Sequence, residues 1–411
     1  MKIESARRKL QLAVVTETYP PEVNGVARTI GVMVAALRSR GHRIQLVRPR
    51  QRGEEAPPPE RDFETVLRVG FPLPRYPELR MGLPAKRALA RAWRSRRPDI
   101  VQVVTEGPLG NSAVGAARAL GLPVVSEFHT NFHDYSRHYG FGLFSTLVAR
   151  YLRRLHNRAD CTLVPTAEMR SRLAAAGYRR VEVVGRGIDL ELFRPGRRST
   201  ALRQSWGAGE QDLVALIVGR LAPEKNLPLF VDACRAMQAV VPRLKVVVVG
   251  DGPEGARLRA ANRDFVFAGT RAGAALAEHY ASADVFLFPS LTETFGNVTT
   301  EAMASGLAIV AFDYAAARQC LRHRETALLA PAGATAAFVE AAQELAADPR
   351  LRDMLRDGAA AAARVLGWPG VIDDLESILA ELVARSRAGR VTVAAGAGDA
   401  PRIARGDHAP L

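Results

Sequence analysis

The sequence of 411 residues contains little cysteine and no long apolar run. Its three cysteines, Cys161, Cys234 and Cys320, lie far apart, which excludes a disulfide-stabilised scaffold and a C-x-x-C metal site. No apolar run reaches the roughly 18 residues of a membrane-spanning helix, and the N-terminal residues lack the apolar segment of a secretory signal. We therefore expect a cytoplasmic protein that no helix anchors across a membrane.

Acidic residues are scarce in the first half of the chain. Residues 1–200 carry 35 Lys and Arg but 18 Asp and Glu, a net charge of +17, whereas the remaining residues carry 22 and 24, a net charge of −2. The formal charge of the whole chain, +15, therefore comes from the first half. Such an asymmetry indicates an anionic partner, which could be nucleic acid, a membrane surface or an acidic substrate. A general compositional preference for Arg is the alternative explanation.

Short apolar runs alternate with helical patterns along both halves of the chain. In the first half we predict strands at residues 10–16, 43–48, 99–104, 122–127, 160–165 and 181–184, and a helix at 26–40. In the second half we predict strands at 212–219, 244–250, 264–269, 284–289 and 308–312, with helices at 227–240 and 273–282. Near-continuous apolar strands that alternate with helices are typical of parallel sheets covered on both faces. The sequence thus predicts an α/β fold of two doubly wound domains that face each other across a ligand-binding cleft.

Composition also distinguishes the segments between and after these domains. The polar, turn-rich residues 191–210 are typical of a linker, and residues 51–62 are typical of an exposed loop. Residues 387–411 are rich in Ala and Gly without periodicity, so we expect a disordered tail. In this interpretation the N-terminal domain spans residues 1–190 and the C-terminal domain spans residues 191–366.

The densest group of polar residues is P-S-L-T-E-T-F-G-N-V-T-T-E-A-M-A-S-G at 289–306. A buried strand ends at Pro289 and a helix is predicted to begin near Asn297, where free backbone N–H groups can hold a phosphate. Gly296 would let the backbone approach the ligand closely. Glu293 and Glu301 would flank that phosphate, and carboxylates accept hydrogen bonds from sugar hydroxyls. A capping Glu and a second Glu on a solvated helix face are the alternative.

A second polar loop, G-R-L-A-P-E-K-N at 219–226, directly follows another predicted strand. Arg220 and Lys225 lie in this loop, and two cations at the carboxyl end of a strand can neutralise a diphosphate leaving group. A solvated loop with incidental charges is the alternative. Because both loops belong to the same predicted domain, their coincidence favours the functional interpretation of each.

Together these motifs resemble those of the retaining GT-B glycosyltransferases, specifically glycosyltransferase family four. The residues from Glu293 to Gly306 are similar to the family's E-x7-E signature, and 219–226 to its phosphate-binding loop. G-D-G-P at 250–253, G-R-G-I-D…F at 185–193 and T-E-T-Y-P-P-E-V-N-G-V-A-R-T at 16–29 match as well. The resemblance covers residues 10–385 and implies two Rossmann-like domains, with a nucleotide-sugar held mainly by the second. It also implies a C-terminal helix at 367–385 that returns to the first domain.

The resemblance further implies roles for individual residues of this sequence. Arg220 and Lys225 would contact the donor diphosphate during catalysis, Glu293 the hydroxyls of the donor sugar, and Glu301 the ribose. Further donor contacts, mainly through backbone amides, would come from Gly25, Thr294, Phe295, Gly296 and Asn297. Many members have two adjacent glycines where this chain has Asn24 and Gly25, and we assign Asn24 to the acceptor. The leaving phosphate would accept the acceptor's proton in a front-face transfer with retention.

The segment S-E-F-H-T-N-F-H-D-Y-S-R-H-Y-G at 126–140 is rich in histidine and aromatic residues. The family has a histidine near the anomeric carbon, which implies that the side chain or backbone carbonyl of His129 stabilises oxocarbenium-like charge. Asn131, His133 and Tyr135 are candidate acceptor contacts, and surface histidines are the alternative for His133 and His138. His129 and His133 have H-x3-H spacing, but no third zinc ligand is evident.

The sequence also lacks an Asp-x-Asp metal motif and a recognisable covalent nucleophile. This agrees with the family, in which basic residues and a helix start replace a metal, so we expect no cofactor beside the nucleotide-diphosphate sugar. Some GDP-mannose-dependent relatives carry an acidic residue near positions 267–274, where this chain has none before Glu278. That difference favours a UDP-linked donor and leaves a GDP-linked donor open.

The acceptor is indicated by the basic first half. Residues 75–97 are rich in Lys and Arg, and 141–158 combine Arg150, Arg153, Arg154 and Arg158 with apolar residues. On a helix, Phe144, Leu147, Tyr151 and Leu155 would form one apolar side. Basic amphipathic helices bind anionic membranes, although a core-facing stripe with a solvated basic side is the alternative.

Family members with a similar first motif and H-T-x-F loop often glycosylate lipids such as diacylglycerol or phosphatidylinositol. We therefore expect a hexose transferred to a membrane glycolipid precursor, by a peripheral protein on the inner face of the cytoplasmic membrane. A GDP-mannose-dependent mannosyltransferase and a transferase for a soluble sugar or polysaccharide remain alternatives. An epimerase or phosphorylase of the same fold also stays open. A basic nucleic-acid-binding protein is disfavoured, because Rossmann-like domains supply no known nucleic-acid fold.

Overall fold

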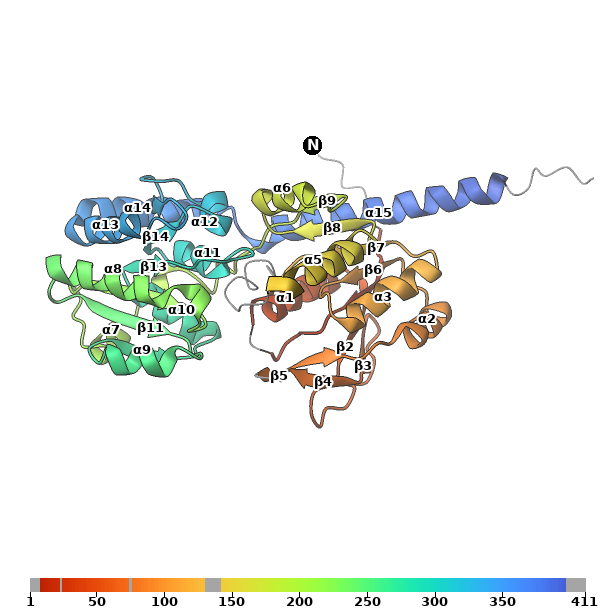
Figure 1. Cartoon of the computed structure of the whole chain (residues 1–411), viewed down its shortest axis with the longest axis horizontal. Helices are drawn as coiled ribbons and strands as arrows, with labels where there is room; N and C mark the ends of the chain where they lie inside the picture. Colours follow the sequence, from red (N-terminus) through yellow and green to blue (C-terminus); the bar gives the residue numbers. More distant parts are fainter. Residues whose placement is uncertain (1–7, 23, 74–75, 130–141, 397–411) are drawn as a thin grey trace, which may run out of the picture.

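The computed structural model describes residues 8–22, 24–73, 76–129 and 142–396. Two α/β domains lie side by side, and a long helix near the C-terminal end of the chain runs back along the first of them (Figure 1). Each domain contains one parallel sheet with helices on both of its faces. The predicted fold class, two doubly wound α/β domains, is confirmed.

The first sheet has seven parallel strands in the order β3-β2-β1-β6-β7-β8-β9. These strands are β1 (Gln11–Val15), β2 (Arg43–Pro49), β3 (Phe63–Arg68), β6 (Ile100–Val103), β7 (Val124–Glu127), β8 (Cys161–Val164) and β9 (Val181–Val183). The helices are α1 (Gly25–Ser39), α2 (Lys86–Ser95), α3 (Pro108–Ala119), α5 (Gly142–His156) and α6 (Ala167–Ala175). A separate antiparallel pair is formed by β4 (Gly70–Leu73) and β5 (Tyr76–Gly82).

The second sheet has six parallel strands in the order β12-β11-β10-β13-β14-β15. These strands are β10 (Val214–Val218), β11 (Lys245–Val249), β12 (Val266–Gly269), β13 (Val285–Phe288), β14 (Ala308–Phe312) and β15 (Leu328–Ala330). The helices are α7 (Thr200–Ser205), α8 (Leu227–Val240), α9 (Gly255–Ala261), α10 (Gly273–Ser282), α11 (Asn297–Ala304), α12 (Ala315–Cys320), α13 (Thr335–Ala347) and α14 (Pro349–Ala363), with short 3-10 turns at Pro195–Arg197 and Pro223–Lys225.

The strand order reverses at one place in each sheet, between β1 and β6 and between β10 and β13. Open α/β sheets bind ligands outside the carboxyl ends of the strands at this switch point. The polar loops 219–226 and 289–296 directly follow β10 and β13. The topology therefore brings the two polar loops of the second domain together at its switch point.

Burial on both faces explains why the central strands have near-continuous apolar sequences. In β10, Ala215 and Ile217 pack in one core with α8 and α13, whereas Leu216 and Val218 pack in another with α10 and α11. A strand covered on both faces leaves no position for a solvated side chain, so the alternation of an amphipathic strand is absent. Strands predicted from apolar runs accordingly occur within two residues of their predicted bounds.

The chain returns to the first domain in helix α15 (Trp368–Gly396). Leu375 and Leu379 are buried in one core with Ile30 and Val34 of α1. Arg40, the residue that directly follows α1, also reaches this helix, and its Nη1 lies 2.8 Å from Asp373 Oδ1. The helix thus covers the same face of the first sheet as α1.

Residues 387–396 are helical, so the irregular tail predicted from residue 387 is wrong over this part. A helix that is already packed gains one backbone hydrogen bond for each added residue and needs no new nucleus, so weak periodicity does not end it. An ion pair of 2.5 Å from Arg387 Nη2 to Asp99 Oδ1 fixes this part of α15 to the first domain. Residues 397–411 lie outside the described residues.

Residues 191–210 are not the linker that their polarity predicts. Phe193, Trp206 and Ala208 are buried in the core of the second domain. The guanidinium of Arg203 is also buried, where its Nη1 donates to Ser282 O at 2.8 Å and Asp284 Oδ2 at 3.1 Å. A charged residue with such partners can lie inside a domain. The prediction of a linker, which relied on polarity alone, is therefore wrong for this segment.

The strands between residues 63 and 82, and β15, were not predicted. All six residues of β3 are only partly buried, because β3 is the edge strand of the first sheet. An edge strand does not need a continuous apolar run, so the pattern that identified the central strands is missing. Residues 51–62 contain no helix or strand, as expected of a loop.

Candidate active site

The loop after β10 is shaped by the close approach of a second loop, G-D-G-P at 250–253. A Cβ atom on Gly250 would lie 1.9 Å from Gly219 O, and one on Gly252 would lie 2.4 Å from Leu221 O. Gly250 also has a φ of +134°, which favours glycine. These glycines allow the contact that fixes the loop carrying Arg220, whose Nη2 lies 2.5 Å from Glu224 Oε1.

Lys225 and Glu293 form an ion pair between the two polar loops. The Ser290 hydroxyl donates a second hydrogen bond, of 2.8 Å, to the same Glu293 oxygen. The Leu291 N–H donates to Glu224 O at 2.9 Å and joins the loops through their backbones. The switch point thus holds an ammonium and a carboxylate together, each with less than a fifth of its side chain exposed.

Helix α11 begins directly after Gly296, which has a φ of +95° and a backbone conformation that favours glycine. The free N–H groups of its first turn follow the loop that carries Glu293. Glu301 lies one turn further on and is buried. Its Oε1 lies 2.5 Å from Nη1 of Arg28, a residue of α1 in the other domain.

The side chain of His129 contacts Glu127 and Arg186, both of which lie before residue 190. Its Nε2 lies 2.8 Å from Glu127 Oε2, and Arg186 Nη2 donates to its Nδ1 at 3.2 Å. Burial raises the pKa of Glu127, but His129 and Arg186 more than offset this, so the pKa lies below its ordinary value. The backbone carbonyl of His129 instead accepts a 2.7 Å hydrogen bond from the Thr294 hydroxyl of the second domain.

Asn24 and Gly25 lie where α1 begins. Asn24 caps this helix, since its Oδ1 accepts from Ala27 N at 2.8 Å, and its Nδ2 donates to Thr18 Oγ1 at 2.7 Å. Both amide atoms of the side chain are therefore bound within the protein. A Cβ atom on Gly25 would meet no atom of the described residues within 4 Å, so packing against them does not require glycine there. The open space fits the approach of a donor to the backbone.

Models of known protein families match most of the chain. The family described as Glycosyltransferase Family 4 matches residues 23–192, and that described as Glycosyl transferases group 1 matches residues 212–348. A GDP-mannose-dependent alpha-mannosyltransferase of Mycolicibacterium smegmatis is 36% identical over 373 residues, which cover 89% of this chain and 96% of the relative. The chain belongs to glycosyltransferase family 4.

A second relative and a solved structure extend this comparison. A GDP-mannose-dependent alpha-(1-6)-phosphatidylinositol monomannoside mannosyltransferase of Mycobacterium tuberculosis is 28% identical over 357 residues, covering 82% of this chain and 89% of the relative. The structure of sucrose-phosphate synthase from Thermosynechococcus elongatus superimposes with a TM-score of 0.72, 17% identity, and coverage of 92% of this chain and all of that one. The resemblance and the GT-B fold predicted from the motifs are confirmed, and the chain is a retaining nucleotide-sugar glycosyltransferase.

In this family 4 glycosyltransferase, the residues predicted to bind the donor come from loops that the fold brings together. Arg220 and Lys225 follow β10, and the segment from Glu293 to Glu301 follows the neighbouring strand β13. Gly25 and His129 follow strands of the first domain, and Thr294 connects to His129 across the domains. Phe295 is buried and its carbonyl accepts from Ala316 N.

Some of the predicted features lie beyond what the structure describes. Asn131, His133, Tyr135 and His138 lie outside the described residues. In the part of the chain that is described, no group of three or more His, Cys, Asp or Glu could hold a metal ion. None of the described helices combines the length and the apolar character needed to cross a bilayer.

Sequence reasoning missed the residues that act between elements. Arg28, Glu127 and Arg186 contact predicted site residues but were assigned no role of their own. Arg28 lies in the motif at 16–29 and Arg186 in the motif at 185–193. Their positions inside family motifs could have indicated a role for these two arginines. Their partners could not be predicted, because the partners are distant in the sequence.

Proposed function

We propose that this glycosyltransferase transfers mannose from GDP-mannose, with retention, to the hydroxyl of a lipid acceptor. The observation that carries the donor assignment is the 36% identity to a GDP-mannose-dependent alpha-mannosyltransferase over nearly the whole of both chains. The phosphatidylinositol mannoside acceptor named for the second relative supports a lipid.

The ion pair of Lys225 and Glu293 gives the donor site a simple mode of action. On binding, the donor would replace the ion pair. The Lys225 ammonium would then contact the diphosphate, and the Glu293 carboxylate would accept hydrogen bonds from the sugar hydroxyls. Arg220 would share the charge of the diphosphate, while N–H groups at the start of α11 would hold the distal phosphate and sugar. Thr294 and Gly25 would complete this site from the two sides of the cleft.

The transfer step follows from these contacts. The bond between the sugar's anomeric carbon and the diphosphate oxygen would break, and the acceptor oxygen would attack from the same face. The acceptor's proton would pass to the departing phosphate oxygen, whose charge Arg220 and Lys225 stabilise. The backbone carbonyl of His129 is the dipole that could stabilise positive charge on the sugar, since the imidazole is held by Glu127 and Arg186.

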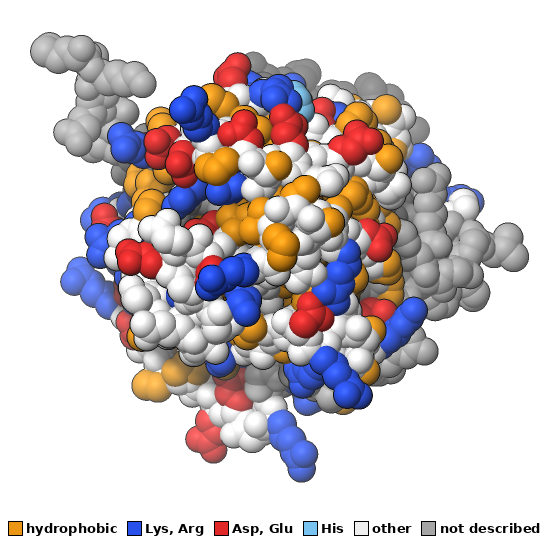
Figure 2. Space-filling model, turned by 90° about the vertical axis from the view of Figure 1, so that its left-hand side faces the viewer, with side chains coloured by type: hydrophobic (Ala, Val, Ile, Leu, Met, Phe, Trp, Pro, Cys, Tyr) orange, Lys and Arg blue, Asp and Glu red, His pale blue; other side chains and the backbone are white. Residues whose placement is uncertain are grey.

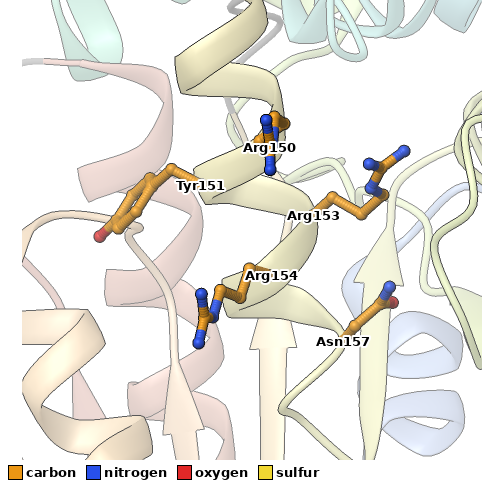
Figure 3. Close-up of a pocket in the computed structure, with 5 residues that line it drawn as sticks. All are labelled: Arg150, Tyr151, Arg153, Arg154 and Asn157. Carbon is orange, nitrogen blue, oxygen red and sulfur yellow. The ribbon is translucent and has the colours of Figure 1, made fainter.

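Helix α5 supports a lipid acceptor and a peripheral position on the cytoplasmic face of a membrane. A hollow of about 440 Å³ is lined by Arg150, Tyr151, Arg153 and Arg154 of this helix and by Asn157, which directly follows it (Figure 3). The guanidinium groups of Arg150 and Arg154 form no hydrogen bond or ion pair with another described residue. Leu147 and Val148 are exposed beside them, with 62% and 37% of their surface accessible. Guanidinium groups beside exposed apolar side chains fit an anionic lipid surface.

The predicted apolar side of this helix is divided in the structure. Leu155 is buried in the first domain, whereas Leu147 and Tyr151 are exposed. The alternative of a core-facing stripe therefore applies to Leu155, and not to Leu147 and Tyr151. On the face of the second domain that Figure 2 shows, basic and acidic side chains are interspersed.

A UDP-linked donor is the second candidate. The observation that favours it is the absence of an acidic residue from positions 267–274, which include the end of β12 and the loop after it and would lie near the base. Such a residue could accept hydrogen bonds from guanine, whereas backbone groups can read either base.

Ligand-dependent stabilisation tests the donor. We expect GDP and GDP-mannose to raise the unfolding midpoint more than UDP, ADP and their sugars at equal concentration, because binding to the native state stabilises it by mass action. GDP-mannose should then support mannose transfer to lipid extracts. A larger shift with UDP would indicate that the donor is a UDP-sugar and not GDP-mannose. No shift with any nucleotide would contradict the proposed donor site.

A further inference from the structure

Arg28 of the first domain forms an ion pair with Glu301, which lies in the predicted donor motif of the second domain. It lies in the first turn of α1, three residues after Gly25, and its Nη1 is 2.5 Å from Glu301 Oε1. The two residues are separated by 273 positions in the sequence. Neither the mechanism above nor the resemblance gives Arg28 a role.

The two partners differ strongly in exposure. The Glu301 side chain is 6% exposed, whereas that of Arg28 is 44% exposed. Burial raises the pKa of Glu301, and Arg28 and the neighbouring Tyr280 hydroxyl oppose that rise. A carboxylate buried without a cation would tend to take up a proton and would then accept hydrogen bonds less strongly. Arg28 therefore lowers the pKa of this buried carboxyl, although burial still holds the pKa above its ordinary value.

Aromatic residues of the second domain hold this arrangement in place. The Arg28 guanidinium lies 5.2 Å from the ring centroid of Phe193, within the range of a cation–π contact. Phe193 packs edge-on against Tyr280, with ring centroids 5.8 Å apart. Arg28 thus contacts both an aromatic ring and a carboxylate of the second domain. Its ion pair uses one of the two Glu301 oxygens.

We propose that Arg28 is a donor-site positioning residue, supplied by the first domain, which holds the Glu301 carboxylate in place for the ribose hydroxyls of the donor. This proposal rests on the proposed function, in which Glu301 binds the ribose. It means that recognition of the nucleoside is completed only when the two domains lie against each other. A carboxylate has acceptor sites for Arg28 and for ribose hydroxyls together.

Nucleotide binding with and without ribose hydroxyls tests the proposal. Isothermal titration calorimetry would measure the affinities of GDP and UDP, and of their 2′,3′-dideoxy analogues, for the wild type and for Arg28→Gln. We expect Arg28→Gln to weaken binding of the preferred nucleotide by about tenfold, as for loss of a charged hydrogen-bond partner. Binding of its dideoxy analogue should change by less than about threefold, because that analogue does not use Glu301.

Two further variants control for charge and geometry. Arg38→Gln removes the same charge from the same helix, where Arg38 pairs with Glu60 and Asp62 instead, and it should leave both affinities unchanged. Arg28→Lys should recover part of the affinity for the ribose-containing nucleotide. Equal weakening of both nucleotides by Arg28→Gln, or tighter binding of either, would overturn the role of Arg28. A wild type that binds no nucleotide would instead overturn the proposed function.

Discussion

Glu293 and Glu301 are carboxylates of the same motif, but their surroundings differ. Glu293 contacts Lys225 and Ser290 in the loop, whereas Glu301 is buried in α11 beside Arg28. If Glu293 binds the donor sugar, its contacts should strengthen in the transition state. If Glu301 binds the ribose, it should stabilise the bound substrate and the transition state equally. The two residues should therefore fail in different ways.

We predict that Glu293→Gln lowers kcat by about 10²–10³, the cost of losing one preorganised electrostatic group. Glu301→Ala should mainly raise the KM for the donor, with a smaller effect on kcat. Steady-state kinetics with varied donor would measure both, and circular dichroism would show whether each variant is folded. Equal and small effects of both substitutions on kcat and KM would contradict these assignments.

The two cations of the loop after β10 should matter for departure of the diphosphate. Lys225→Ala and Arg220→Ala should each reduce kcat at saturating donor by about 10²–10³, because the leaving group loses a fixed positive charge. Lys225→Ala also leaves Glu293 without its ammonium partner, so its effect should be the larger. A variant with near wild-type kcat would show that its residue does not contact the diphosphate.

Glu17 is a buried carboxyl at the end of β1. Its oxygens accept from Gly82 N at 2.9 Å and from Leu109 N at 3.1 Å. Burial raises its pKa from 4.5 to about 6, which outweighs the opposite effect of these hydrogen bonds. The folded protein therefore holds this proton more tightly than the unfolded chain, and the free energy of unfolding should fall as the pH rises through this range.

Between pH 5 and pH 8, we expect ionisation of Glu17 to lower the free energy of unfolding by about 1 kcal/mol. Urea denaturation of the wild type and of Glu17→Gln at several pH values would isolate it, because the variant cannot titrate. The wild type should lose stability relative to the variant as the pH rises. A difference between the two proteins that is independent of pH would contradict the raised pKa.

At the scale of elements, the first domain depends on packing against α15, the last helix that the structure describes. Leu379 is fully buried in the core that α15 shares with α1 and the first sheet. Leu379→Ala should lower the free energy of unfolding by about 2–5 kcal/mol, through lost apolar contact and the cavity that remains. Denaturant melts would measure it.

An exposed position of the same helix provides the control for α15. Arg385 has 70% of its side chain exposed and pairs only with Glu381 on the helix surface among the described residues. Arg385→Ala should change stability by no more than about 0.5 kcal/mol. Similar effects of both substitutions would show that α15 does not stabilise the first domain by burial.

At the scale of the molecule, the separation of charge between the halves should direct the protein onto anionic membranes. Replacing Arg150 and Arg154 together by Gln should reduce binding to phosphatidylglycerol-containing vesicles at low salt by roughly tenfold or more, at about 1 kcal/mol for each basic residue. Rising salt should weaken wild-type binding, because it screens exposed charges. Vesicle sedimentation would measure both effects.

The matched control removes two exposed arginines of the second domain. Arg243 and Arg257 have more than 80% of their side chains exposed, so replacing both by Gln changes the net charge equally. This variant should bind vesicles as the wild type does. A wild type that ignores anionic vesicles at low salt would favour a soluble sugar acceptor, and binding that persists at high salt would indicate apolar insertion.

Local patterns of the sequence were sufficient to predict the fold class and the positions of the two polar loops after β10 and β13. The central strands were predictable because strands buried on both faces must be apolar nearly throughout. The loops with Arg220, Lys225 and Glu293 were predictable because each follows such a strand directly and combines glycine with charge. Side-by-side placement of β10 and β13 then joins the loops.

Only the tertiary structure decided which charged groups meet. The contact of Arg28 with Glu301, and the orientation of His129 between Glu127 and Arg186, join residues from different elements or domains. Burial of Arg203 in a segment that is polar in sequence was equally hidden. Sequence determined the elements and their motifs because these depend on neighbouring residues. Packing between distant segments decided the partners, because a charge carries no local signal of whether it will face water or an opposite charge.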